Sequence, residues 1–121
     1  MPQLSRDQVL GYVGKPLQIE TVKVPEWGGE LFVREWSGEE RDAYEMTFVN
    51  PDGTKNLEAT KNLRARLVVR SVVDEQGRHP FSDDDVEMLG TLSAKALNRV
   101  FDRARKLHGM TSDDVAELEK N

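Results

Sequence analysis

Hydrophobic residues follow two different periods along this chain, and these periods predict a hairpin followed by helices. Residues 17–24 and 30–36 are rich in β-branched and aromatic side chains and alternate with a period of two, as half-buried strands do. Between them, residues 25–29 contain a proline and end in Gly-Gly, which favours a tight reversal and therefore a β-hairpin. One face of the first strand carries Leu17, Ile19 and Thr21.

The rest of the chain has the spacing of helices. We expect helices over residues 39–48, over 55 to about 69, over 82–89 and over 94–107, each with apolar residues at helical intervals. Short helices are predicted to open the chain near Ser5 and to close it after Thr111. Ser5 with Gln8, and Ser37 with Glu40, have the form of capping boxes. Residues 67–73 are rich in valine, and pattern alone leaves helix or strand open there.

The strongest apolar stripe lies in residues 94–107. Leu97, Val100, Phe101, Ala104 and Leu107 recur at intervals of three, one, three and three, which places them on one buried face of a helix. The predicted architecture is therefore α+β, with an N-terminal β-hairpin packed beside a mainly α-helical bundle. We expect residues 1–121 to form a single domain, made of an N-terminal helical turn (1–14), the hairpin (15–36) and a mainly helical part (37–121).

Composition narrows the class of protein. Of the 121 residues, 37% are hydrophobic and 32% are charged, so most of the charge has to lie on exposed helix faces. There is no cysteine, which excludes disulfides and thiolate chemistry. No apolar stretch reaches the length of a membrane span or of a signal-peptide core. We therefore expect a protein of the cytoplasm that makes no contact with a membrane.

Charge is unevenly distributed around the net value of −5. Residues 55–70 hold five basic side chains and one acidic one, and so do residues 94–108. Acidic residues concentrate in 39–45, 83–87 and 113–119. Such segregation either steers a partner or a second copy, or is neutralised between neighbouring helices of one chain.

No group of residues indicates catalysis or metal binding. His79 and His108 are separated by a predicted helix, and neither has a second ligand at metal-binding spacing. The consecutive carboxylates of Asp83–Asp85 suit a helix N-terminus better than a calcium loop, which needs alternating ligands. Residues 11–15 lack the spacing of a phosphate-binding loop. We expect no enzyme activity, no metal and no cofactor.

The candidate partner-binding residues are basic or aromatic. In the helix over 94–107 the basic residues recur at intervals of four, four and three and share the face opposite the apolar stripe: Lys95, Arg99, Arg103 and Lys106. The chain is acidic overall, with a pI near 5.1, which favours an acidic protein partner over nucleic acid. Trp27 in the predicted turn and Trp36 after the second strand are either binding anchors or parts of the core.

Several segments together resemble one protein family. Residues 24–29 read Val-Pro-Glu-Trp-Gly-Gly and are followed by Val-Arg-Glu at 33–35 and by Ser-Gly with Glu-Arg-Asp up to residue 42. Residues 72–77 read Val-Val-Asp-Glu-Gln-Gly, with Phe-Ser and Asp-Asp-Val downstream. This order is similar to that of tail assembly chaperones of long-tailed phages and prophages, in their short form, from about Gly14 onward.

The resemblance implies a non-catalytic protein of tail morphogenesis. It would bind the tape measure protein, keep it soluble and help recruit tail-tube subunits, the tube protein being contacted by a frameshifted longer form. It would act as a homo-oligomer in the bacterial host cytoplasm and be absent from the mature virion. Two other classes stay open: a small virion structural protein such as a head–tail connector, and a DNA-binding regulatory module.

Overall fold

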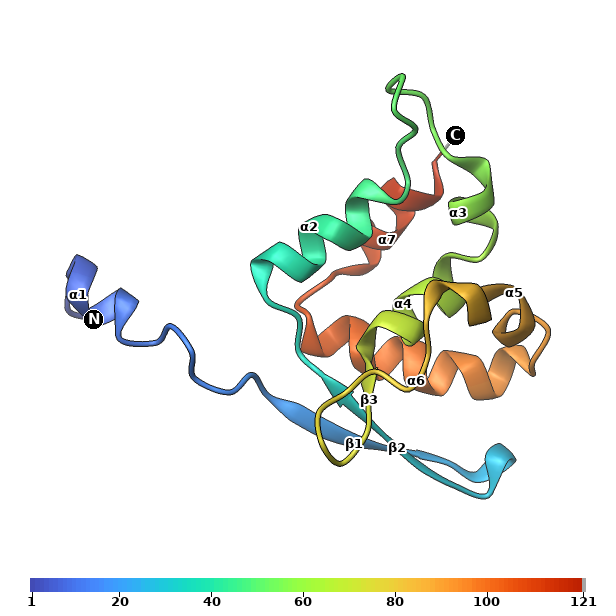
Figure 1. The fold of residues 1–121 in the computed structure, drawn as a ribbon, viewed down its shortest axis with the longest axis horizontal. Helices are drawn as coiled ribbons and strands as arrows, with labels where there is room; N and C mark the ends of the chain where they lie inside the picture. Colours follow the sequence, from blue (N-terminus) through green and yellow to red (C-terminus); the bar gives the residue numbers. More distant parts are fainter. Residues whose placement is uncertain (121) are drawn as a thin grey trace.

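The computed structural model describes residues 1–120, and within them the chain is α+β, as the sequence predicts. Helices pack beside a small antiparallel sheet formed largely by the N-terminal part of the chain (Figure 1). The elements in chain order, with η for a 3₁₀ turn, are α1 (Arg6–Leu10), β1 (Ile19–Val24), η1 (Pro25–Trp27), β2 (Gly29–Arg34), α2 (Gly38–Met46), α3 (Leu57–Lys61), α4 (Leu63–Ser71), β3 (Val72–Val73), η2 (Asp83–Asp85), α5 (Val86–Leu89), α6 (Ala94–Leu107) and α7 (Ser112–Glu119).

The predicted hairpin is present, with β1 and β2 antiparallel and joined through η1. Gly28 takes a φ of +75°, a conformation that favours glycine and lets the chain reverse. The face that the hairpin buries differs from the one that the sequence emphasised. Val22, Val24 and Val33 are buried against α6, whereas Leu17, Ile19 and Thr21 lie outside the core and Ile19 is half exposed.

The hairpin continues into a third strand. β3 pairs antiparallel with β2, with Val72 opposite Val33 and Val73 opposite Phe32. This settles the open question over residues 67–73, because α4 runs to Ser71 and the chain then becomes extended. Val68 and Val69 therefore belong to α4, whereas Val72 and Val73 form β3. β2 is the central strand of the sheet.

The long helix predicted from residue 55 is divided into two. Asn62 leaves the helical conformation, with φ −116° and ψ +36°, and separates α3 from α4. Leu57, in the separate helix α3, is 65% exposed. α4 packs against α6 through Leu63, Leu67 and neighbouring apolar residues.

The apolar stripe of α6 forms the centre of the core, as predicted. Leu97, Val100, Phe101 and Ala104 are buried, and Leu107 packs at the edge of the cluster. The helix starts where Ser93 accepts a hydrogen bond from the backbone N–H of Ala96. The capping boxes at Ser5 and Ser37 are both formed, so these sequence signals mark true helix starts.

The N-terminal segment lies apart from this core. Figure 1 shows α1 and the extended stretch after it leading away from the sheet and helices. Every side chain in residues 1–16 is exposed, and we call this segment the N-terminal arm. Among the described residues, none of the helices is both long enough and apolar enough to span a bilayer.

Candidate functional site

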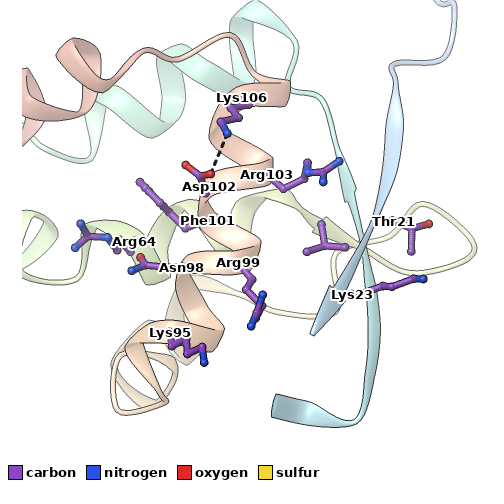
Figure 2. A pocket seen from close by; sticks show the side chains of 11 residues that line it. Thr21, Lys23, Arg64, Lys95, Asn98, Arg99, Phe101, Asp102, Arg103 and Lys106 are labelled. Carbon is purple, nitrogen blue, oxygen red and sulfur yellow. Dashed lines mark ion pairs between the residues drawn. The ribbon is translucent and has the colours of Figure 1, made fainter. Parts of the chain in front are cut away.

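A basic groove runs between α6 and the β1 edge of the sheet. It has a volume of about 860 Å³ and is lined by Thr21, Val22, Lys23, Arg64, Lys95, Asn98, Arg99, Phe101, Asp102, Arg103 and Lys106. Six of these side chains are cationic and only Asp102 is anionic. Figure 2 shows Arg99 and Arg103 of α6 directed toward β1, Lys106 turned toward Asp102, and Arg64 beyond Phe101. The groove is thus suited to an acidic partner.

α6 presents these residues because its two faces differ. Its apolar stripe is held in the core against α4 and the sheet, so the opposite face has to remain in water. The predicted basic residues Lys95, Arg99, Arg103 and Lys106 all line the groove. The prediction that they share one surface is confirmed by their position, whereas their role in binding stays a prediction.

Part of the positive charge is neutralised within the chain. Arg99 donates to both carboxylate oxygens of Glu26 at 2.8 and 2.9 Å, and Arg103 donates to Glu20 at 3.3 Å. Lys106 lies 3.2 Å from Asp102 on the next turn of α6. The backbone N–H of Glu26 and the Arg99 guanidinium lower the pKa of the Glu26 carboxyl. The pairs with Glu26 and Glu20 connect α6 to the hairpin, whereas the pair with Asp102 lies within α6.

Three cations of the groove keep their charge uncompensated. Within residues 1–120, Lys23, Arg64 and Lys95 form no ion pair. The guanidinium of Arg64 lies over the ring of Phe101, 5.4 Å from its centroid. Sequence reasoning missed Lys23 and Arg64, because only the fold brings β1 and α4 to the same groove. The basic run over 55–70 was the available signal for Arg64.

The two tryptophans have different environments. Trp27 lies in η1 at the end of the hairpin and is 39% exposed, so it can reach a partner. Trp36, which the sequence also offered as a partner-binding residue, is 7% exposed. Its indole N–H donates to the carbonyl of Arg70 at 2.9 Å. Trp36 therefore belongs to the core.

Both histidines form hydrogen bonds with neighbouring parts of the fold. The Nδ1 atom of His108 accepts a hydrogen bond from the backbone N–H of Trp36 at 3.0 Å, and its Nε2 lies 2.8 Å from the hydroxyl of Ser71. His79 is exposed in a loop and contacts the carbonyl of Val72. In residues 1–120 no three His, Asp or Glu side chains are grouped as metal ligands would be.

Comparison with known proteins decides the family. The family model described as phage tail assembly chaperone matches residues 15–121, which is most of the chain. The chain belongs to the phage tail assembly chaperone family. Its fold is also similar to that of a solved structure entitled "Structure of bacteriophage HK97 tail assembly chaperone", with a TM-score of 0.56 and 22% sequence identity. That match covers 85% of this chain and 98% of the HK97 chain. No curated protein matches this chaperone significantly.

Family membership gives the basic groove its context. The groove lies wholly within the part of the chain that the family model matches, whereas most of the N-terminal arm lies outside it. All the residues of the groove come from α4, α6 and β1. This tail assembly chaperone thus carries the basic groove along α6, the longest of its described helices.

Proposed function

We propose that this tail assembly chaperone binds a helical segment of a tape measure protein in the basic groove and keeps that protein soluble before the tail is assembled. The observation that supports it is a groove of about 860 Å³ with six cations, of which Lys23, Arg64 and Lys95 form no ion pair among the described residues. An acidic face on the client segment would complement this charge and select its orientation.

Affinity has to come from more than ion pairs. Exposed pairs contribute only about 0–1 kcal/mol each, so the aliphatic stems of the lysines and arginines must also be covered by the client. Trp27 lies in η1, which contacts α6, and it supplies an aromatic anchor beside the groove. Because a tape measure protein is long, many copies of the chaperone would bind along one client and gain avidity.

The cellular location, the longer form and the absence from the virion are proposed from what the family resemblance implies. The chaperone acts without catalysis in the host cytoplasm, and a frameshifted longer form contacts the tail-tube protein. It leaves before the particle is complete. Mass spectrometry of purified particles tests this last step, because a head–tail connector would remain in the virion at stoichiometric amounts and a chaperone would not.

The test of client binding is co-expression with a tape measure fragment that is insoluble alone. The variant Lys23→Glu/Lys95→Glu reverses two groove cations that form no ion pair within residues 1–120, and it keeps both partners of the Arg99–Glu26 and Arg103–Glu20 contacts. The matched control is Lys61→Glu/Arg78→Glu, which changes the net charge equally at exposed positions outside the groove.

We expect the wild type and the control to bring the fragment into the soluble fraction, and the groove variant to leave most of it insoluble. If both variants solubilise the fragment, the groove is the wrong site. If the wild type fails as well, and double-stranded DNA is retained on the purified protein at physiological salt, the DNA-binding alternative replaces the chaperone function. The DNA-binding alternative is supported by the basic residues that α6 presents on one face.

A further inference from the structure

The N-terminal arm exposes an unusual amount of apolar surface. Its apolar side chains are 45–76% exposed in Leu4, Val9, Leu10, Tyr12 and Val13. Single exposed apolar residues are ordinary, but five in one short segment indicate a surface that another protein covers. The family model starts at residue 15, so this feature is not explained by the matched region.

The arm has local structure of its own. α1 begins with a complete capping box between Ser5 and Gln8. Further along the arm, the ammonium of Lys15 lies 4.6 Å from the centroid of the Tyr12 ring. A segment that is already partly ordered loses less conformational entropy when it docks than a random coil does. The arm is therefore built as a docking element.

A second depression of the surface offers a matching site. It lies between α2 and α7, has a volume of about 660 Å³ and is lined by Asp42, Glu45, Met46, Phe48, Val49, Gly53, Lys55, Glu117 and Leu118. We call it the α2–α7 hollow. Met46 and Val49 are exposed there, at 67% and 46%. The ammonium of Lys55 is already engaged by the carbonyl of Leu118.

Charge distinguishes this hollow from the basic groove. The arm carries two cations, Arg6 and Lys15, against Asp7. The α2–α7 hollow carries three carboxylates against Lys55; Glu45 pairs with Arg41 and Glu117 with Lys120, so Asp42 is the carboxylate of the hollow that forms no ion pair among the described residues. The arm, with one net positive charge and five exposed apolar side chains, fits this hollow better than the groove, which holds six cations against one carboxylate.

We propose that the N-terminal arm of one copy packs into the α2–α7 hollow of a second copy. Figure 1 shows the arm leading away from its own body instead of folding over α2 and α7, as an exchanged arm would. The donating and receiving surfaces are different, so the contact is heterologous and each copy both gives an arm and receives one. Copies can then join head to tail while the basic groove stays open. This inference does not depend on the client proposed above.

Disulfide trapping tests the contact directly, because the chain has no cysteine of its own. Chains with Val13→Cys are mixed with size-tagged chains carrying Met46→Cys and are oxidised mildly. The control uses Met88→Cys, since Met88 is 65% exposed and lies outside the hollow. Docking raises the effective concentration of the two thiols, so we expect the Val13–Met46 product to exceed the Val13–Met88 product by about fivefold or more.

Equal yields of the two products would overturn the proposal. So would an intramolecular disulfide in a dilute Val13→Cys/Met46→Cys chain, because the arm would then dock on its own copy. Sedimentation gives an independent reading. Leu10→Asp/Val13→Asp should lower the mass of the assembly, while Leu57→Asp/Met88→Asp, at exposed positions elsewhere, should not. A wild-type chain that stays monomeric at about 100 µM also refutes the contact, since weak specific contacts have Kd values in the micromolar range.

Discussion

The indole ring of Trp36 stacks on the imidazole of His108, with 3.8 Å between the ring centroids and 8° between the planes. The backbone N–H of Trp36 also donates to Nδ1 of this imidazole, so the ring carries its proton on Nε2, which donates to Ser71. Ser71 in turn donates to the carbonyl of Leu67. The end of α6 is thereby tied to both α4 and the start of α2 by a histidine that has to be neutral.

The first prediction concerns the stability of the fold at low pH. Burial of the ring, with help from Arg41 and Arg34 and against Glu40, lowers the pKa of His108 from 6.5 to about 4. The unfolded chain therefore binds a proton below pH 6.5 that the folded chain refuses until about pH 4. At about 1.4 kcal/mol per pKa unit, and reduced for the partial exposure of the ring, we expect folding to lose about 2 kcal/mol as pH falls across this window.

Urea unfolding at pH 7 and pH 5 measures the upper part of this window, where about 1 kcal/mol of the loss is expected. His108→Gln should flatten the dependence, and His79→Gln is the control at an exposed position. If the two variants change the slope equally, the buried imidazole is not its source. Above about pH 7.5 His108 adds little pH dependence, because it is then neutral in both the folded and the unfolded chain.

The second prediction concerns the core. Phe101 is 6% exposed and packs within the central cluster. Phe101→Ala should cost about 3–5 kcal/mol of unfolding free energy, because it removes the ring and leaves a cavity that the surrounding helices fill only in part. Leu57→Ala, at an exposed position of α3, should cost less than about 1 kcal/mol. Denaturant titration of both variants decides it, and a small loss for Phe101→Ala would contradict the packing of α6.

The sequence predicts well those features that depend on neighbouring residues. The stripe of α6 and the capping boxes at Ser5 and Ser37 are local patterns, and the structure confirms them. The interaction of Trp36 with His108 joins residues 72 positions apart, and no periodicity indicates such a contact. For the same reason the sequence leaves Trp36 open as either a binding anchor or a core residue, and the structure places it in the core.

The candidate site divides in the same way. The four basic residues of α6 are found from helical spacing, but Lys23 and Arg64 enter the groove only through the packing of β1 and α4. The pairing of Arg99 with Glu26 likewise depends on the packing of the hairpin against α6. Pattern alone left neutralisation within the chain and recognition of a partner as alternatives, and in the structure the groove contains both paired and unpaired cations.

The third prediction concerns that pairing. A double-mutant cycle with Glu26→Gln and Arg99→Gln should give a small, favourable coupling, because the Nε–H of Arg99 is shared between both carboxylate oxygens of Glu26 but the pair is open to water. The coupling should fall in 1 M salt, where the Debye length is about 3 Å. A coupling of zero at low salt would show that the hairpin is held on α6 by apolar contacts alone.

The last prediction separates an acidic protein segment from nucleic acid by salt dependence. A segment bound by the three unpaired cations Lys23, Arg64 and Lys95 gains at most about 1 kcal/mol from each ion pair. Raising salt from about 50 to 200 mM screens only part of this, so its Kd should rise by less than about tenfold. DNA held by the same three cations would lose about 40-fold in affinity over the same range, because nearly one counterion is released for each phosphate that the protein neutralises.

Fluorescence anisotropy with a labelled tape measure peptide and a labelled 20-base-pair duplex measures both slopes on one protein sample. We expect detectable peptide binding with the shallow slope and no duplex binding at 200 mM salt. Lys23→Glu/Lys95→Glu should abolish peptide binding, because it turns two attractions into repulsions. A steep slope for the peptide would mean that charge alone holds it, and then the apolar stems and Trp27 would have no part in recognition. Tight duplex binding at 200 mM would instead favour the DNA-binding alternative, because salt at this concentration weakens phosphate contacts more than contacts with a peptide.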